Sequence, residues 1–459
     1  MDNNKEKNGW WFGFIWLAAL IIGVAVAAGY FDFLRLALPF IFLAAFLFLP
    51  EEYGLYALAL FLPAINWNFY YHGLLIPLVD LLGLAILAAF VIRKIYDRLF
   101  RRERFSLRLP LLIPFGFFLI AAFVSCFFAN YIRDSLWYFV RWILFFYSVY
   151  LVFPVNAANK ETVLRRAVVC LVGGGVITAA IGLISIFFQD WTYQFVRALP
   201  LSFGGLYPLG DNHNLLAEVL VVSFIFTQAL KSWTTSVASR RWLDILTIFQ
   251  LLILLVTFSR AAWIAVAVQI IIWFIISARR LGRSVWVMFF VGLVVLSPLF
   301  FYMYQLQSEF SIGISSTENR LIMTDIAWDK FLDKPIFGQG TGTFINFIAD
   351  DIRFIAKYGA PLDSHGVLQK IILENGLIGL FAFLAVLWSY LTVMFRALKK
   401  YRQRYQWLLP LFLGSVGIIV MELFNTSYYK GKLWLPIALC LAAVNIIRRN
   451  ERKKDYAKN

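Results

Sequence analysis

The sequence is 459 residues long, with 61% hydrophobic and only 15% charged residues. A soluble globular protein is about 45–50% apolar and about 25% charged, so this composition excludes an ordinary soluble enzyme, a disordered chain and a fibre. Lys and Arg outnumber Asp and Glu by 42 to 26, which gives a formal net charge of +16. In a chain this hydrophobic the excess points first to a membrane, because multispanning proteins hold Lys and Arg in cytoplasmic loops.

Apolar segments long enough to cross a bilayer recur along the whole chain. A spanning helix needs about 20 mostly apolar residues. The second and third segments are short and are separated only by Glu51 and Glu52, so twelve spans are the alternative to fourteen. We predict an all-α polytopic membrane protein with a bundle of 12–14 transmembrane helices. The fourteen segments are 10–29, 32–49, 54–71, 74–92, 110–129, 136–153, 167–188, 214–230, 243–259, 261–278, 285–304, 368–394, 407–425 and 432–447.

The loop charges predict the orientation of the bundle. With the amino terminus inside, every strongly basic cluster falls on the cytoplasmic face, as the distribution of Lys and Arg in multispanning proteins requires. Both termini are therefore expected in the cytoplasm. The positive charge is a topology signal, and no nucleic-acid partner is expected. The clusters are Arg93 to Arg108, Lys160 to Arg166, Lys231 to Arg241, Arg279 to Arg283, Arg396 to Arg404 and Arg448 to Lys458.

The same orientation places two long loops outside, 189–213 and 305–367. Loops this long are usually functional or disordered. In the second loop, Ser315 and Glu318 have the spacing of a capping box before an amphipathic helix. A further amphipathic helix is expected over 344–358, ending at Gly359. We predict one transmembrane domain, 1–459, with 305–367 as an extracytoplasmic helical insert.

His365 lies in Asp363-Ser364-His365-Gly366, just before the span that starts near 368. Imidazole is the side chain best suited to moving a proton near neutral pH. The alternative is a solvated loop histidine without a chemical role. Locally the second interpretation is the commoner one.

Arg260 lies at the tip of a tight hairpin, in Ser259-Arg260-Ala261-Ala262-Trp263. Ionisable residues at membrane depth are costly and are functional candidates by default. The alternative is an arginine that reaches lipid phosphate, with Trp263 as an interfacial anchor.

Arg320 lies in the first turn after the expected capping box. Free N–H groups at a helix start bind anions, and a guanidinium beside them strengthens that binding. The alternative is a solvated ion pair with Glu318 or Asp325.

The remaining polar motifs allow structural interpretations. Asp211-Asn212-His213-Asn214 can be the polar cap of the next span, and Gly338-Gln339-Gly340-Thr341-Gly342 is expected to form a turn, since it does not follow a strand. No spacing of His, Cys, Asp or Glu indicates a metal site, and no cofactor is expected. Some charges in apolar runs are expected to pair inside the bundle. These are Arg35, Asp80, Arg141, Glu218, Glu374 and Glu422.

Taken in order, four of these motifs resemble those of the bacterial O-antigen ligase and O-antigen polymerase family. Ser259-Arg260-Ala261-Ala262-Trp263 is similar to the family's Ser-Arg-x-x-Trp motif. The stretch from Asn319-Arg320 to Gly338-Gln339-Gly340 is similar to its arginine-to-Gly-x-Gly segment. Ser364-His365 followed by Glu374-Asn375-Gly376 is similar to its histidine motif, although Gly366 stands where the family usually has Asn. Asp211-Asn212-His213-Asn214 is a looser match. The resemblance covers about 210–390.

The resemblance implies a glycosyltransferase of the GT-C-like membrane type. Such proteins move a glycan from an undecaprenyl-diphosphate carrier to the hydroxyl of a glycolipid or glycan acceptor, at the outer face of the cytoplasmic (inner) membrane. In this interpretation His365 is the catalytic base, Arg260 and Arg320 bind the diphosphate, and transfer is metal-independent and inverting. Supporting roles fall to Ser259, Trp263, Asn212, Asn214, Asp363 and Glu374.

Two other functions remain open from the sequence. A ligase uses lipid A–core or another surface acceptor, whereas a polymerase uses a second lipid-linked repeat, and the same residues serve both. A transporter or flippase of lipid-linked sugars would also have many spans and buried charges. Transporters usually have repeated halves, and we find no such repeat. Convergence of Arg260, Arg320 and His365 on one place would favour an enzyme.

Overall fold

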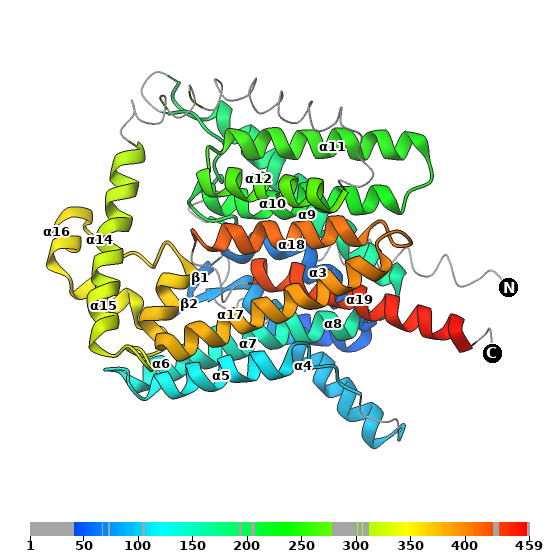
Figure 1. Cartoon of the computed structure of the whole chain (residues 1–459), viewed down its shortest axis with the longest axis horizontal. Helices are drawn as coiled ribbons and strands as arrows, with labels where there is room; N and C mark the ends of the chain where they lie inside the picture. Colours follow the sequence, from blue (N-terminus) through cyan, green and yellow to red (C-terminus); the bar gives the residue numbers. More distant parts are fainter. Residues whose placement is uncertain are drawn as a thin grey trace.

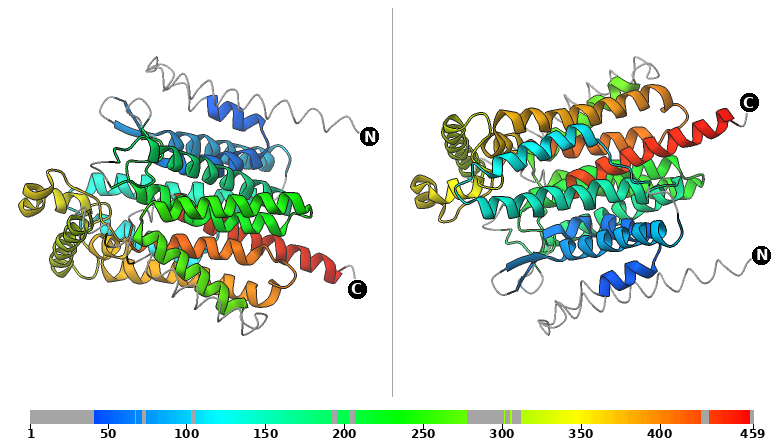
Figure 2. Two further views of the ribbon diagram at one scale, coloured as in Figure 1. Left: turned by 90° about the horizontal axis from the view of Figure 1, so that it is seen from above. Right: turned by 90° about the horizontal axis from the view of Figure 1, so that it is seen from below.

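The computed structural model describes residues 41–66, 68–71, 74–102, 106–191, 195–202, 207–277, 301, 305, 312–425 and 431–456. Its long helices lie side by side along the long axis of the molecule, and a helical group crosses one end of them (Figures 1 and 2). The C-terminal end of the last helix points to the opposite end. The expected spans 10–29 and 285–304 lie wholly or mostly outside the described residues, as does Arg35.

The described helices follow the expected apolar segments closely, and five helical stretches among them are long and apolar enough to cross a membrane. The prediction of an all-α polytopic membrane protein is confirmed. Two π-helical turns, η2 (Phe139–Leu144) and η3 (Ser148–Val152), join α6, α7 and α8 into one stretch. The helices are α3 (Glu51–Phe61), α4 (Leu78–Leu99), α5 (Leu112–Cys126), α6 (Ile132–Tyr138), α7 (Phe145–Tyr147), α8 (Phe153–Ala157), α9 (Glu161–Phe187), α10 (His213–Ser232), α11 (Val237–Val256), α12 (Arg260–Ser277), α14 (Ile312–Asp333), α15 (Phe344–Asp350), α16 (Ile352–Tyr358), α17 (Val367–Tyr401), α18 (Leu408–Glu422) and α19 (Gly431–Tyr456).

The helix expected over 54–71 is wrong in its second half. Helix α3 ends at Phe61, a 3-10 turn η1 (Leu62–Asn66) follows, and the chain then forms a short antiparallel hairpin. Strand β1 (Asn68–Tyr71) pairs with β2 (Leu74–Pro77), with Phe69 opposite Ile76. An aromatic run beside turn-forming Asn residues favours strands and turns, a preference that hydropathy alone does not register.

Buried charges inside the bundle are paired. The Glu218 carboxylate in α10 lies 3.1 Å from the Lys432 ammonium of α19, and both side chains are almost wholly buried. Arg141 lies 3.3 Å from Asp80, which ties the η2 turn to α4. A charge removed from water is tolerated only when it is paired in this way. The expected pairing of such residues is therefore confirmed for Asp80, Arg141 and Glu218.

Helix α17 is broken at Gly376, which has φ 61° and ψ −164°. The break leaves backbone groups on both sides without their helical partners, and the segment 335–340 supplies replacements. Leu377 and Ile378 donate to the carbonyls of Pro335 and Ile336 at 2.9 and 3.3 Å. In return, the carbonyls of Leu373 and Glu374 accept from the N–H groups of Gln339 and Gly340 at 2.9 and 3.0 Å. Non-helical backbone at membrane depth requires such complete replacement.

This exchange brings two glycines into backbone contact. Gly338 has φ +78°, and a Cβ there would lie 2.4 Å from the Glu374 carbonyl oxygen. Gly376 has φ +61°, and a Cβ there would lie 2.4 Å from the Ile336 oxygen. Both positions need the left-handed region and the missing side chain of glycine. The glycine-rich stretch 338–342 forms a turn, as predicted, and the structure shows that this turn docks onto α17.

Helices α14, α15 and α16 form the group that crosses one end of the bundle (Figure 1). They share a small hydrophobic core with α17, whose members include Met323, Ile326, Phe344, Ile348, Phe354 and Leu373. This core lies apart from the larger core of the bundle. The insert is thus attached to α17 both by side-chain packing and by the backbone exchange at Gly376.

Two details of the insert differ from the predictions. Helix α14 is already helical at Ile312, so Ser315 does not begin it and the expected capping box is wrong. The helix expected over 344–358 is two helices, because the Asp351 carboxylate accepts the N–H groups of Arg353 and Phe354 and caps a new helix there. The expected end at Gly359 is confirmed, and this glycine has φ +76°.

Replacing Gly338 with alanine is expected to destabilise the protein by more than about 2 kcal/mol, because it adds backbone strain and a clash with the Glu374 carbonyl. Gly359→Ala is the matched control. It carries similar strain at φ +76°, but its Cβ would meet no atom within 4 Å. Thermal unfolding in detergent, followed by tryptophan fluorescence, compares the two. Equal transition temperatures would contradict the proposed docking role of Gly338.

Candidate functional site

Arg260 is exposed at the first residue of α12, after a tight turn from α11. Phe258 takes a left-handed conformation in this turn, with φ 55°. Ser259 is wholly buried, and its hydroxyl donates to the Asn214 Oδ1 at 2.6 Å and accepts the Ala262 N–H at 3.4 Å. This serine therefore caps α12 and ties its start to the start of α10.

Asn212 and Asn214 position the start of α10. The Asn212 side chain accepts the Asn214 N–H at 2.9 Å, which is a standard N-cap contact. The Asn214 side chain then accepts from Ser259 in the next helix pair. Between these two residues, His213 is held beside the turn that carries Arg260. The motif 211–214 is therefore a polar cap, as expected. Through Asn214 it also links the start of α10 to the turn that carries Arg260.

Aromatic packing supports the same turn. The Trp263 ring lies 6.0 Å from the Phe258 ring, and the Phe195 ring meets Phe258 edge-on at 4.6 Å. Trp263 is half-buried and packs against the main core. Edge-to-face aromatic pairs add stabilisation beyond the area that they bury. The contact of Trp263 with Phe258 fixes the conformation of the turn.

Arg320 lies in α14, on the insert. Its Nε atom is buried and has no hydrogen-bond partner among the described residues. The ion pair with Glu318 that was the alternative does not form, because Glu318 pairs with Lys357 of α16. Burial, and then the charge of Arg260, lower the pKa of Arg320. A guanidinium stays protonated at any working pH, so Arg320 is a cation in a half-buried place.

His365 lies in the loop that leads into α17. The Ser364 hydroxyl accepts the Gly366 N–H at 3.1 Å and lies 2.9 Å from the Gln369 Oε1. The Gln369 amide donates to the Thr324 hydroxyl at 3.1 Å, one turn after Arg320 in α14. This chain of hydrogen bonds holds the His365 loop against the turn that carries Arg320.

Gly366 follows the histidine and lies against α18. A Cβ there would meet the Leu423 carbonyl oxygen at 3.1 Å, which leaves little room for a side chain. This contact gives a structural reason for glycine at the position where the resembled family usually has Asn. It also places the His365 loop at the end of α18. Just after that helix, the Asn425 amide donates to the Glu218 carboxylate of α10.

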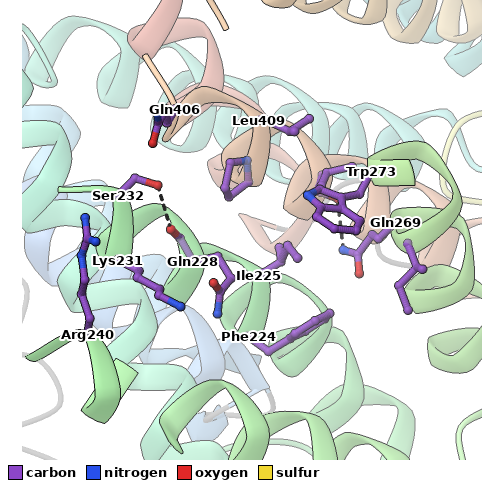
Figure 3. A pocket seen from close by; sticks show the side chains of 13 residues that line it. Phe224, Ile225, Gln228, Lys231, Ser232, Arg240, Gln269, Trp273, Gln406 and Leu409 are labelled. Carbon is purple, nitrogen blue, oxygen red and sulfur yellow. Dashed lines mark hydrogen bonds between the residues drawn. The ribbon is translucent and has the colours of Figure 1, made fainter. Parts of the chain in front are cut away.

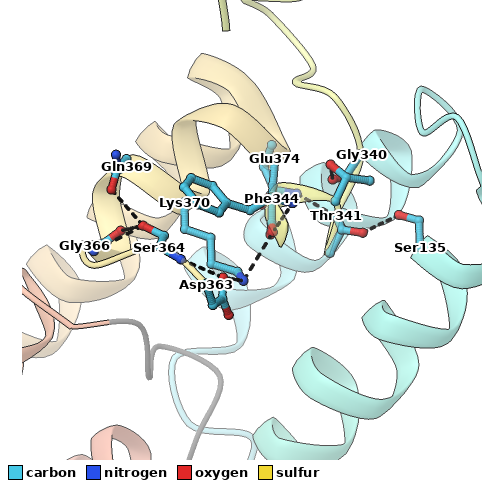
Figure 4. Close-up of polar contacts among 12 residues, drawn as sticks. Ser135, Gly340, Thr341, Phe344, Asp363, Ser364, Gly366, Gln369, Lys370 and Glu374 are labelled. Carbon is cyan, nitrogen blue, oxygen red and sulfur yellow. Dashed lines mark hydrogen bonds and ion pairs between the residues drawn. The ribbon is translucent and has the colours of Figure 1, made fainter. Parts of the chain in front are cut away.

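A buried ion network lies beside Ser364 and Gly366, the two neighbours of His365 in the chain (Figure 4). The Lys370 ammonium lies 2.5 Å from the Asp363 Oδ1 and 3.4 Å from the Glu374 Oε1. Lys370 is 1% exposed and Glu374 is wholly buried. Glu374 also accepts the Phe344 N–H at 3.2 Å, which links the network to α15. Asp363 and Glu374, expected as supporting residues, therefore fix the loop on both sides of His365.

Electrostatic interactions join these segments. The charges of Arg260, Arg320 and Arg197 all act on His213. Burial, together with the charge of Arg320 and against that of Asp363, lowers the pKa of His365 from 6.5 to about 4. His365 is therefore neutral near pH 7 and can accept a proton. Cationic side chains from α12, α14 and the 195–202 segment thus act on His213, and the α14 arginine also acts on the neutral His365.

Arg197 and Lys370 were not predicted as part of this region. Arg197 has no motif around it, and only its position in the outer loop 189–213 pointed to the site. Lys370 did leave a signal, since it stands four residues before Glu374 in a helix and opposite charges at that spacing pair. In the described part of the chain, no group of three His, Cys, Asp or Glu side chains is placed to hold a metal ion.

A cavity of about 510 Å³ lies elsewhere, between α10, α12 and α18 (Figure 3). Lys231 in its lining stands eighteen residues along α10 from His213, which is about 27 Å at the rise of a helix. Its basic side chains are occupied, since Lys231 pairs with Asp244 at 2.6 Å and Arg240 donates to the Thr234 carbonyl at 2.8 Å. It is thus distinct from the His365 region. Its polar lining includes Gln228, Lys231, Ser232, Arg240, Gln269 and Gln406.

The helices and this cluster define a polytopic membrane protein with a cationic, histidine-containing end beside a helical insert. Comparison with known proteins then supports the resemblance drawn from the motifs. Residues 245–384 match the family model described as O-antigen ligase, a segment that contains Arg260, Arg320 and His365. The resemblance to the O-antigen ligase family is confirmed, and the family indicates activity of the O-antigen ligase type.

A curated relative supports the same assignment. A Rickettsia conorii protein named "Putative polysaccharide ligase" is 23% identical over 332 residues, which cover 70% of this chain and 76% of the relative. The alignment is therefore not confined to the segment that the family model matches. Both comparisons are therefore to proteins described as ligases, one of O-antigen and one of polysaccharide.

Lys370→Met is expected to destabilise the protein by about 3–5 kcal/mol, because it leaves Asp363 and Glu374 without their buried cation. The matched control is Lys357→Met, since Lys357 is exposed and its ion pair with Glu318 is screened by water. Thermal unfolding in detergent should show a large loss for the first variant and little for the second. Adding Glu374→Gln should restore part of the loss, and equal stability of both lysine variants would refute the network.

Proposed function

We propose that this chain is a membrane glycosyltransferase that moves a glycan from an undecaprenyl-diphosphate carrier to an acceptor hydroxyl on the extracytoplasmic face of the cytoplasmic membrane. The observation that carries the proposal is that Arg320 interacts electrostatically both with Arg260 and with the neutral His365. Both arginines act on the same neighbourhood without a carboxylate partner in the described chain. A transporter does not need a neutral base at such a place, and an enzyme of this type does.

The arginines bind the diphosphate of the donor. A guanidinium matches phosphate oxygens with two parallel N–H donors. Arg260 approaches from the tip of the α11–α12 turn and Arg320 from the insert, so the diphosphate lies between bundle and insert. Their fixed charges favour the transition state, because negative charge on the diphosphate grows as the sugar leaves. This neutralisation needs no metal ion.

His365 acts as general base. Its unprotonated nitrogen takes the proton of the acceptor hydroxyl while the acceptor oxygen forms a bond to the anomeric carbon. The bond from that carbon to the diphosphate oxygen breaks, and its electron pair leaves with the diphosphate. A single direct displacement inverts the anomeric configuration. The network of Asp363, Lys370 and Glu374 holds the loop that carries the base.

The membrane orientation follows the loop charges. Both termini lie in the cytoplasm, and the insert and His365 lie outside, where lipid-linked glycans are presented. A ligase acceptor is favoured over a second lipid-linked repeat, since the curated relative carries the name of a polysaccharide ligase. The discriminating product is a ladder of chain lengths formed from lipid-linked repeats alone, which only a polymerase makes.

His365→Ala is expected to reduce the transfer rate by about 10²–10⁴-fold, because a positioned general base contributes an effect of that size. Donor binding should stay within about threefold of wild type, since the arginines hold the diphosphate. The assay uses purified protein with lipid-linked glycan and acceptor. The control is Arg353→Gln, an exposed arginine of the insert paired with Asp351. Near wild-type transfer by His365→Ala would overturn the mechanism.

The pH dependence tests the state of His365. Protonation removes the accepting nitrogen, so activity is present above its pKa and is lost as the pH falls through about 4. Titration of His365 should therefore leave kcat/KM constant from about pH 8 down to about pH 6. Arg320→Gln should move the lower limb to higher pH, because the charge of Arg320 lowers the pKa. A wild-type midpoint near 6.5 would show an ordinary solvated histidine instead.

A further inference from the structure

Arg197 lies beside the same cluster but belongs to none of the motifs. Its backbone is fixed on both sides by the Gln189 side chain, which donates to the Arg197 carbonyl at 2.6 Å and accepts the Arg197 N–H at 3.2 Å. The next residue, Ala198, is wholly buried and donates to the Val256 carbonyl at 3.0 Å. The chain around Arg197 is thus attached to the end of α11.

The same contacts align Arg197 with Arg260. Phe195 packs edge-on against Phe258 at 4.6 Å between ring centroids, and each ring stands two residues before one of the two arginines. Arg260 follows Ser259, which is hydrogen-bonded to Asn214, and His213 precedes that asparagine. The charges of Arg197 and Arg260 both act on His213. Two neighbouring segments therefore present a guanidinium each beside the start of α10.

Nothing in the described chain neutralises Arg197. Within the described residues, no ion pair joins its guanidinium to a carboxylate. Burial lowers the pKa of this guanidinium. Elsewhere in the bundle the buried cations Lys370 and Lys432 each have a carboxylate within 3.1 Å or less. A half-buried cation left without an acid is suited to an anion that arrives from outside.

We infer that Arg197 is a third arginine of the donor site and that it binds the released prenyl diphosphate more strongly than the intact donor. This inference rests on the proposed function, because it assigns a role within the same reaction. In the donor the diphosphate is esterified at both ends and carries roughly one charge on each phosphate. Arg260 and Arg320 together match these two charges. Arg197 is then available to bind the additional negative charge that the reaction creates.

The reaction creates that charge at one atom. The bond between the anomeric carbon and the bridging oxygen breaks, and its electron pair stays on the terminal phosphate, while the acceptor proton passes to His365. The terminal phosphate becomes a monoester, which loses its second proton near pH 6 and so carries one more negative charge at about pH 7.5. Binding that strengthens as charge develops lowers the barrier.

The test compares two probes on purified protein in detergent at about pH 7.5, where the charge difference is present. The first is farnesyl diphosphate, a monoester, and the second is its glucosyl diester. Arg197→Gln should weaken binding of the monoester by about tenfold and leave the diester within about twofold, since one charge-assisted contact is lost only with the monoester. Arg197→Lys should retain more of the monoester affinity. Arg353→Gln should leave both affinities unchanged.

The outcomes separate this inference from the proposed function. If Arg260→Gln weakens both probes while Arg197→Gln binds both like wild type, the third arginine is refuted and the donor site stands. Equal weakening of both probes by Arg197→Gln also refutes the selective role, whether it arises from a folding defect or from a contact made in both states. If wild-type protein binds neither probe, the proposed donor site itself is wrong.

Discussion

The backbone exchange at Gly376 is the interaction on which the rest of the site depends. A helix of a membrane bundle cannot leave N–H and C=O groups unpaired, and here the segment 335–340 pairs them. That segment is the end of the insert, so the break in α17 is also the attachment point of α14. Arg320 comes from one side of this junction and His365 from the other. The broken helix thus fixes the distance between a cation and a base that lie far apart in sequence.

The distribution of acids among the cations distinguishes structure from function. Lys370 and Lys432 are buried and each lies beside a carboxylate, which is the arrangement that keeps a buried charge stable. Arg260 and Arg320, in contrast, have no carboxylate partner in the described chain. The charge of Arg260 acts on Arg320, and this repulsion between two cations raises the free energy of the site. An anionic ligand would relieve this cost, and the lipid-linked diphosphate that we propose as donor has the charge to do so.

Much of this organisation could be read from the sequence, and the failures have physical causes. Hydropathy located α10, α12 and α18 within a few residues, because a bilayer imposes length and composition on each helix. It missed the β1–β2 hairpin, because the hydropathy of an aromatic run is the same whether the run forms a helix or a strand. Motif spacing predicted Arg260, Arg320 and His365 as site residues, and they keep that role in our proposal. It could not predict Arg197, whose place depends on the packing of Phe195 against Phe258, 63 residues away in the chain.

The central claim is that a diphosphate binds between Arg260 and Arg320 with His365 facing the sugar. An experimental structure of the protein with a bound prenyl diphosphate tests it most directly. We expect phosphate oxygens within hydrogen-bonding distance of both guanidinium groups, about 2.7–3.2 Å, at the insert end of the bundle. A diphosphate bound instead in the cavity lined by Lys231 and Arg240, with the two arginines unoccupied, would contradict it.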